Sequence, residues 1–282
     1  MAVAIDSRQY RFGFLIASLD DYPADFDAVS LGENFRIALF LPRDDAGWFG
    51  RSRYPPRVVM VSGDAIEVRP HPASREHPIG FRLSELQFIE CGHILLQGWL
   101  RFVAVRYDVT LAYNTGSSSC IDEFLAELRA AVTPPPAAET AAEPTRFGEP
   151  LDLKFTNALR YELAPGECAR IQLFNPAKLK AWRWGVVRRE TWSAGDLLVL
   201  TSRRLLWIAD RSLGRHQRYG TVTSYAPIRS LQSWRCGRAG ETSELVFRFV
   251  RGSEWRVPVP ASLEGAAAGF LNEFEQRWGM AL

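Results

Sequence analysis

The chain has 282 residues, which is enough for one large domain or for two domains of ordinary size. Hydrophobic residues make up 47% and charged residues 23%, close to the average of soluble globular proteins, so a sizeable core is expected. The net charge of +2 hides an asymmetry, because residues 1–149 carry 14 Lys+Arg against 20 Asp+Glu (−6), whereas residues 150–282 carry 20 against 12 (+8).

Cysteine spacing and hydropathy argue against a secreted or membrane-spanning chain. The cysteines stand singly and form no CxxC pair, so we read them as buried free thiols in a reducing compartment rather than as a disulfide scaffold or metal site. They are Cys91, Cys120, Cys168 and Cys236. The longest apolar stretch, "HILLQGWLRFVAV", contains polar residues and is too short to cross a bilayer. We therefore expect a cytoplasmic protein without a signal peptide or transmembrane helix.

The first half begins with residues that we leave loosely assigned, including an acidic segment. This segment contains Asp20, Asp21, Asp25 and Asp27, whose spacing does not fit a calcium loop and favours a solvated loop. Next, "RVVMVSGDAIEVRP" predicts two strands joined by a turn. The half ends with "SSSCIDEFLAELRAAV", a predicted amphipathic helix with Ser119 as its cap. Its apolar stripe is Ile121, Phe124, Leu125, Leu128 and Val132.

A proline-rich segment, "TPPPAAETAAEPTRFGEP" (133–150), separates the two halves. Consecutive prolines favour extended polyproline II and prevent helix or sheet from continuing. We therefore predict a first unit at 1–132, an exposed linker at 133–150 and a second unit at 151–282.

The second half predicts a series of short strands and a final helix. The strands are expected at Ala169–Phe174, Trp184–Thr191, Asp196–Thr201, Leu205–Ala209, Ile228–Trp234, Leu245–Val250 and Glu254–Pro258. The helix is expected in "ASLEGAAAGFLNEFEQRW", with Ser262 as a plausible cap. Its stripe is Ala267, Phe270, Leu271, Phe274 and Trp278.

The two halves repeat the same order of segments. "RVVMVSGDAIEVRP" aligns with "LLVLTSRRLLWIAD" at an offset of 139 residues (201 − 62), and the final helices align at an offset of 146 (271 − 125). Identity is low, so the pattern alone indicates a duplicated fold. We predict a mainly β, α+β chain of two similar units, each with about seven antiparallel strands and one C-terminal amphipathic helix.

This order resembles the pleckstrin-homology-like (PH-like) superfamily, particularly its bacterial members. The opening "LAPGECARIQLFNP" (163–176) is similar to the family's first strand, and "LLVLTSRRLLWI" (197–208) to its L-x-L-T-x-R-R-L hairpin. A third match is "YGTVTSYAPIRSLQSW" (219–234). The first unit lacks the arginine pair and resembles the family by element order alone. The resemblance implies two tandem barrels, each closed by a helix, and used for binding rather than catalysis.

The arginine pair Arg203–Arg204 lies at the joint of the predicted hairpin. Arginine forks in a loop bind phosphate or carboxylate in a bidentate manner. The alternative is that both are solvated turn residues, with one laid over apolar neighbours.

A second basic segment, "KLKAWRWGVVRRETW", interleaves cations with tryptophans. This composition is typical of a membrane interface or of a nucleic-acid stacking platform, and also of an ordinary half-buried strand pair. Further cations follow in "DRSLGRHQRYG". The candidate residues for anion or partner binding are Lys178, Lys180, Trp182, Arg183, Arg188, Arg189, Arg203, Arg204, Arg215 and Arg218.

Motifs for catalysis, cofactors or metals do not occur: the sequence has no HExxH, GxSxG, GxGxxG or P-loop. We predict a non-catalytic intracellular scaffold acting through protein–protein or self-association, with no cofactor, no metal and no nucleic-acid partner. The alternative is peripheral docking of the basic second unit to anionic lipid at the inner face of the membrane, and an uncharacterised enzyme is third.

Overall fold

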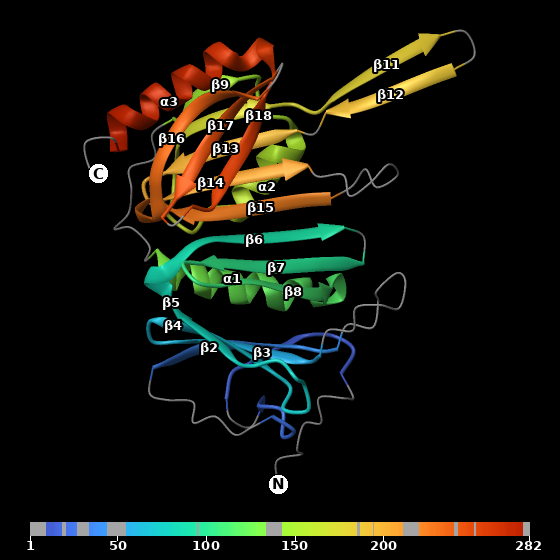
Figure 1. Cartoon of the computed structure of the whole chain (residues 1–282), viewed down its shortest axis with the longest axis vertical. Coiled ribbons are helices and arrows are strands. Elements are labelled where there is room, and N and C mark those ends of the chain that lie inside the picture. The colour runs from blue at the N-terminus through green and yellow to red at the C-terminus, as the bar shows by residue number, and fades with distance from the viewer. Residues whose placement is uncertain are drawn as a thin grey trace. The chain divides into compact units, whose positions relative to one another are not determined.

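The structure is a computed structural model. It describes residues 10–18, 21–26, 34–43, 55–94, 96–133, 143–184, 187–193, 195–210, 220–239, 242–250 and 252–278. Contacts divide the chain into two compact units (Figure 1). The first comprises Met1–Leu86 and His93–Pro134, and the second comprises Gln87–Gly92 and Pro135–Leu282.

The first unit contains a five-stranded antiparallel sheet with the order β1-β2-β3-β4-β5. Its strands are β1 (Phe14–Ile16), β2 (Phe35–Leu41), β3 (Arg57–Ser62), β4 (Ala65–Pro70) and β5 (Ile79–Arg82). Strand β6 (Leu86–Ile94) follows, and most of it belongs to the second unit. The antiparallel pair β7 (Gln97–Ala104) and β8 (Asp108–Asn114) comes next and leads into α1 (Ser118–Val132).

The second unit contains most of the remaining elements. They are β9 (Thr145–Gly148), α2 (Leu153–Glu162), β10 (Ala169–Asn175), β11 (Lys178–Trp184), β12 (Val187–Ser193), β13 (Asp196–Thr201), β14 (Arg204–Asp210), β15 (Gly220–Pro227), β16 (Leu231–Ala239), β17 (Thr242–Phe249), β18 (Glu254–Val259) and α3 (Glu264–Trp278). One sheet runs in the order β15-β14-β13-β10-β9, a second is β16-β17-β18, and β11 pairs with β12 alone. All pairs are antiparallel except β9 with β10.

The order of elements repeats between the two units. In the first unit, strands β2 to β5 are followed by a 3-10 turn, three strands and a helix. In the second unit, strands β10, β13, β14 and β15 are likewise followed by a 3-10 turn, three strands and α3. Strands β6 and β16 both have nine residues, offset by 145 (231 − 86), and the helices both have fifteen, offset by 146 (264 − 118). The order of elements in the two units is thus similar, apart from β11 and β12, which lie between β10 and β13 in the second unit.

Individual backbone hydrogen bonds repeat as well. Leu83 N donates to Asp64 O (2.6 Å) in the first unit, and Ile228 N donates to Arg203 O (2.9 Å) in the second. These bonds join the β3–β4 hairpin to the 3-10 turn before β6, and the β13–β14 hairpin to the 3-10 turn before β16. The same local geometry is thus built from two different sequences.

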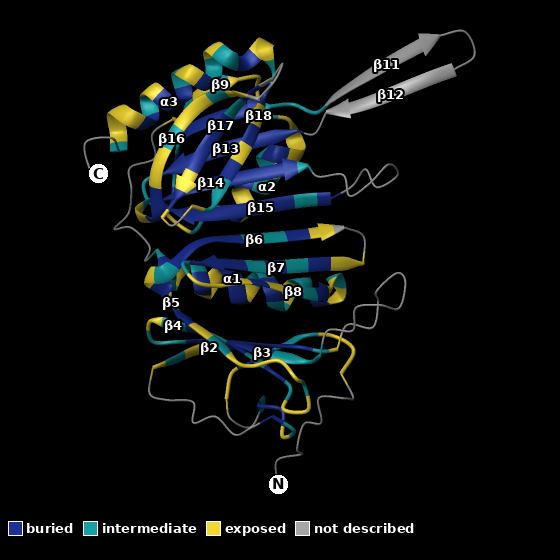
Figure 2. Cartoon of the chain, in the orientation of Figure 1, coloured by how far each residue is buried: buried dark blue, intermediate teal, exposed yellow. Residues whose placement is uncertain are grey.

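The two predicted helices bury the expected stripes (Figure 2). All five stripe residues of α1 are buried, as are the stripe residues of α3 except Trp278, which is half-buried. The cap prediction was wrong for Ser119, because α1 begins at Ser118 and Ser119 lies inside its first turn. Phe270 and Phe274 are fully buried, so apolar packing holds α3 in its place.

The mainly β, α+β class is confirmed, but several details of the prediction were wrong. The described part of the chain has three α-helices rather than two, and none of its sheets closes into a barrel. The predicted strand Trp184–Thr191 is instead the end of β11 and most of β12. Strand β15 was missed, and β9 lies within the segment that we predicted as a linker.

Helix α2 was missed because its stripe is short. Only Phe155, Leu159 and Glu162 are buried on it, and Glu162 is an acid that no hydrophobic pattern would include. The helix is capped by Asp152, whose side chain accepts from Phe155 N at 2.9 Å. Phe155 packs against Phe174 of β10 with ring centroids 5.0 Å apart, which fixes α2 on one face of that strand.

Strand β6 supplies the second unit with residues Gln87–Gly92. Gln87 is buried, its amide donates to Val250 O and accepts from Ser253 Oγ, and Ser230 Oγ donates to Gln87 O at 2.8 Å. Phe88 packs against Phe249 and Trp255 with ring centroids 5.2 and 5.5 Å apart. The second compact unit therefore includes residues well outside the predicted boundary at 151.

Within the described residues, none of the helices has the length and apolar character that a membrane crossing requires.

Candidate functional site

The arginine pair of the β13–β14 hairpin is split by the fold. Arg203 is half-buried in the turn, whereas Arg204 is the first residue of β14 and its side chain is only 4% exposed. Arg204 is therefore not a solvated turn residue, and as in the other interpretation its guanidinium binds a carboxylate in a bidentate manner. Its fork is already occupied by an acid of the same unit.

Glu167 is the partner of Arg204, and the two form a buried bidentate ion pair. Arg204 Nε donates to Glu167 Oε1 at 2.8 Å, and Nη2 donates to Oε2 and to the backbone carbonyl of Glu162 (3.0 Å). The guanidinium also lies 5.8 Å from the ring centre of Tyr225. The pair ties the loop before β10 to the start of β14.

Burial is the largest influence on Glu167 and opposes its ionisation, but the hydrogen bonds and charge of Arg204 outweigh it. Smaller contributions come from the N–H of Ala164 and the hydroxyl of Thr201, and the net result is a pKa below the usual value. Glu167 is thus a charged, structural acid at neutral pH rather than a general acid.

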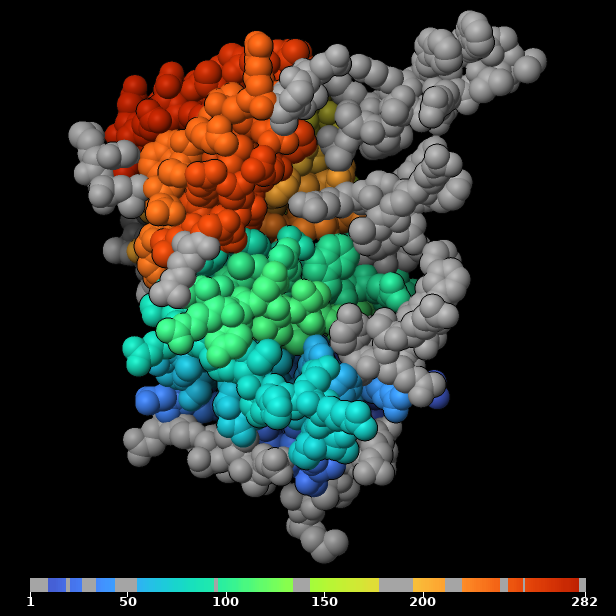
Figure 3. Space-filling view, in the orientation of Figure 1, coloured from blue at the N-terminus to red at the C-terminus, as the bar shows by residue number. Residues whose placement is uncertain are grey.

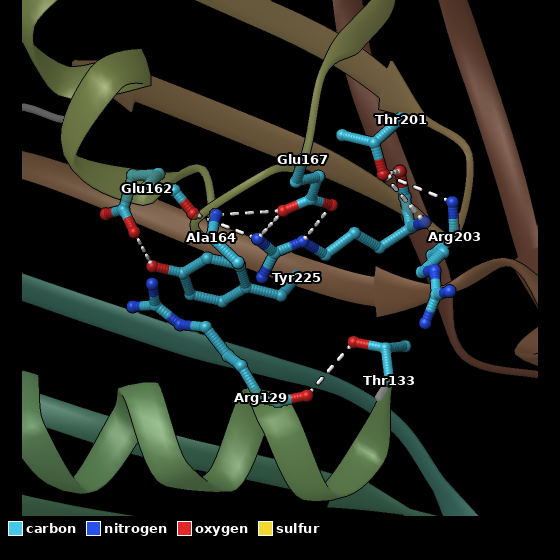
Figure 4. Close-up of polar contacts among 9 residues, drawn as sticks. Arg129, Thr133, Glu162, Ala164, Glu167, Thr201, Arg203 and Tyr225 are labelled. Carbon is cyan, nitrogen blue, oxygen red and sulfur yellow. Dashed lines mark hydrogen bonds and ion pairs between the residues drawn. The ribbon is translucent and has the colours of Figure 1, made fainter. Parts of the chain in front are cut away.

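A second polar contact lies beside this pair. Tyr225 of β15 donates its hydroxyl to Glu162 Oε2, at the last residue of α2 (Figure 4). Thr201 Oγ1 accepts from the N–H groups of Arg203 (3.2 Å) and Arg204 (3.1 Å) and so closes the hairpin turn. These contacts organise the structure around Arg204. Two of the residues involved, Glu162 and Glu167, were not identified from the sequence. The available signal was the "PGE" that precedes β10.

Six other candidates lie on the β11–β12 hairpin. They are Lys178, Lys180, Trp182, Arg183, Arg188 and Arg189. The backbone register sets Arg183 opposite Arg188 and Trp182 opposite Arg189. The structure brings these residues into one two-stranded ribbon, while Arg215 and Arg218 lie outside the described residues.

An exposed strand edge is the clearest surface feature of the second unit. Strand β16 is at the end of its three-stranded sheet and, among the described residues, pairs with β17 only. Trp234 packs on Phe274 of α3 with centroids 4.4 Å apart, so one face is covered. Its exposed positions are Gln232, Ser233, Arg235, Cys236 and Arg238. The orange atoms of this region reach the visible surface of the unit (Figure 3).

The structure describes the four cysteines and, of the acidic segment, Asp21 and Asp25, whereas Asp20 and Asp27 lie outside the described residues. Cys236 is exposed and the other three cysteines are half-buried, so the prediction that all four are buried was wrong.

Asp25 pairs with His71 Nε2 at 3.1 Å, and His71 Nδ1 accepts from Ala73 N, which sets the ring's tautomer. Within the described residues, no group of three or more His, Cys, Asp or Glu could hold a metal ion.

Comparison with known proteins adds no family. No protein-family model matches the chain, and no curated protein matches it significantly in sequence. The function of the chain must therefore be inferred from its own geometry.

Proposed function

We propose that the chain is a non-catalytic scaffold of two tandem PH-like domains that acts through protein–protein or self-association at a sheet edge. The exposed edge of β16 carries this proposal. A strand of nine residues at the end of a sheet presents a row of backbone donors and acceptors, which is a template for a further strand. The repeated four-strand, three-strand and helix order supports the PH-like assignment.

The charge of β16 suggests what kind of strand would be added. Arg235 and Arg238 are exposed along it, so an acidic strand would be favoured over a basic one. Residues 1–149 carry a net charge of −6, which makes a second copy of this chain the first partner to test.

A pair of proline variants tests this edge directly. Neighbouring residues of a strand point their N–H groups to opposite edges of the strand. Of the two variants Arg235→Pro and Cys236→Pro, one therefore removes a hydrogen bond to β17, and the other removes a hydrogen-bond donor from the free edge. The wild-type chain should self-associate in sedimentation velocity. The proline variant that retains the wild-type Tm should be monomeric. Undiminished association in that variant, or a wild-type chain that is monomeric at every concentration, would contradict self-association through β16.

The second candidate function is docking to an anionic membrane, and the β11–β12 register favours it. Arg183 and Arg188 occupy directly opposite positions, where like charges repel unless an anion lies between or near them. Replacing both with alanine should weaken binding to vesicles containing phosphatidylserine by about 2 kcal/mol, roughly 30-fold. Arg235→Ala with Arg238→Ala is the matched control, and equal binding to neutral vesicles would exclude this function.

A further inference from the structure

A groove of about 500 Å³ lies in the second unit between α2 and the strands β9 and β10. Leu159 and Arg160 of α2 and Leu163, which directly follows that helix, line one side, and Arg146 of β9 and Gln172 of β10 line the other. Its volume is in the range of small-molecule sites. The groove persists because α2 is held at both ends, by Phe155 on β10 and by Glu162 on Tyr225.

Gln172 is the unusual residue of this groove. It lies in β10 between the apolar residues Ile171 and Leu173 and is only 5% exposed. Its Oε1 atom accepts no hydrogen bond from any described residue. A buried acceptor without a donor is destabilising, and such an atom in a native protein is ordinarily satisfied by a bound water, ion or ligand that supplies the donor.

The charges around the groove favour an anion. Arg146 and Arg160 are both exposed at its rim. Glu167 is the acid among the lining residues, and its carboxylate is occupied by Arg204. The groove therefore has two arginine forks, and forks of this kind bind carboxylates well.

The remaining wall is apolar and limits the shape of a ligand. Leu159 and Leu163 present aliphatic surface beside Gln172. Strand β9 has only four residues, and prolines lie on both sides of it at Pro144 and Pro150. Because proline has no N–H and the strand is short, this edge is poorly suited to adding a peptide strand, which favours a small molecule.

We propose that this groove binds a small organic carboxylate with an adjacent N–H donor and an aliphatic body, the chemistry of an N-acylated apolar amino acid. The carboxylate pairs with Arg146 and Arg160, the N–H donates to Gln172 Oε1, and the side chain packs on Leu159 and Leu163. The site is independent of the β16 edge and of the β11–β12 ribbon.

N-acetyl-L-leucine is a suitable probe, titrated into the full-length chain by calorimetry. It should bind saturably with one site per chain. Its methyl ester, which has no carboxylate, and isocaproate, which has no N–H, should each bind about tenfold more weakly, as expected for one charge-assisted or one neutral hydrogen bond. The proposal would be overturned if N-acetyl-L-leucine did not bind saturably, or if it, its methyl ester and isocaproate bound equally well. Much tighter binding of acetyl-Ala-Ala-Leu would also overturn it, and would indicate that the groove binds a peptide terminus.

Two variants and one chemical readout complete the test. Gln172→Leu should keep or raise the Tm of the free chain and weaken the probe about tenfold, whereas Gln232→Leu on the exposed β16 strand should leave binding unchanged. A fall in Tm on Gln172→Leu would show that Gln172 is hydrogen-bonded within the fold and would overturn the inference.

The bound probe should also slow alkylation of Cys168, which lines the groove, and should not slow alkylation of the exposed Cys236. Equal rates at Cys168 with and without the probe would place the ligand elsewhere.

Discussion

The β3–β4 hairpin of the first unit and the β13–β14 hairpin of the second share a backbone hydrogen bond and differ in their side chains. In β3–β4 the turn is made by Gly63, with a positive φ of 56°, and by the exposed Asp64. In β13–β14 the turn is made by Ser202 and Arg203, and it leads into the buried Arg204. Because both turns make the same backbone bond to the following 3-10 turn, the fold does not require a buried cation at this position. The ion pair is an addition of the second unit.

The strongest way to break this comparison is Arg204→Met. The change leaves the Glu167 carboxylate buried at 3% exposure without its partner, and we expect a loss of about 3–5 kcal/mol in the free energy of unfolding. Chemical denaturation measures this. Arg203→Met, one residue earlier, should cost less than about 0.5 kcal/mol.

A double variant separates the ion pair from simple packing. Glu167→Met with Arg204→Met replaces both charges by apolar groups and should recover most of the loss, because a buried pair can be exchanged for apolar contacts at little cost. If the double variant is as unstable as the single one, the loss comes from packing rather than from the unpaired carboxylate.

The second comparison concerns the cores beneath the two helices. Phe124 of α1 and Phe270 of α3 are equivalent by the offset of 146 residues (270 − 124) and are both fully buried. Each change to alanine should cost about 3–5 kcal/mol. Hydrogen exchange should localise the loss of protection to the unit that carries the substitution. Loss of protection spread over both units by either change would show that they unfold as one.

The sequence predicted elements well where periodicity and burial agree. β13 has the predicted bounds, and the α1 stripe is buried throughout, because regular apolar spacing reflects the face that meets the core. Helix α2 and strand β9 were missed because one is short with a buried acid and the other lies in a proline-rich segment. Propensity is weak over such lengths, and tertiary contacts decide.

The buried site was harder to predict than the elements. Arg204 and Glu167 are 37 residues apart, and although "PGE" marks the turn that carries Glu167, it does not indicate which residue Glu167 meets. Charge patterning suggested a solvated arginine pair, which is the ordinary fate of arginine in a turn. Burial of Arg204 depends on the strand starting one residue early and on the loop before β10 folding back over it. Both are properties of the whole unit.

Gln87 and Gln232 give the third comparison, since they are equivalent by the offset of 145 residues (232 − 87). Gln87 is buried and hydrogen-bonded to Val250 and Ser253, whereas Gln232 is exposed. Gln87→Leu should cost about 1–3 kcal/mol because it removes two part-buried hydrogen bonds, to the Val250 carbonyl and from the Ser253 hydroxyl. Gln232→Leu should stay within about 0.5 kcal/mol in the same denaturation experiment. Equal effects would mean that burial does not distinguish the two positions.

The smallest expected effect is a pH dependence that belongs to the second unit. The pKa of Glu167 is lowered in the folded state from its ordinary value of 4.5, so the unfolded chain takes up a proton at this site at a higher pH than the folded chain does. The stabilisation from Glu167 is therefore fully present above about pH 4.5 and is lost as the pH falls through the lower folded value. Denaturation of the wild type and Glu167→Gln between pH 7 and pH 3 isolates this contribution, because other acids such as Asp108 contribute equally to both. The stability difference should shrink steadily in acid.

Asp64→Asn, at the exposed turn of the first unit, should change stability by less than about 0.5 kcal/mol throughout. A wild-type advantage over Glu167→Gln that is constant with pH would show that the acid acts by shape and not by charge.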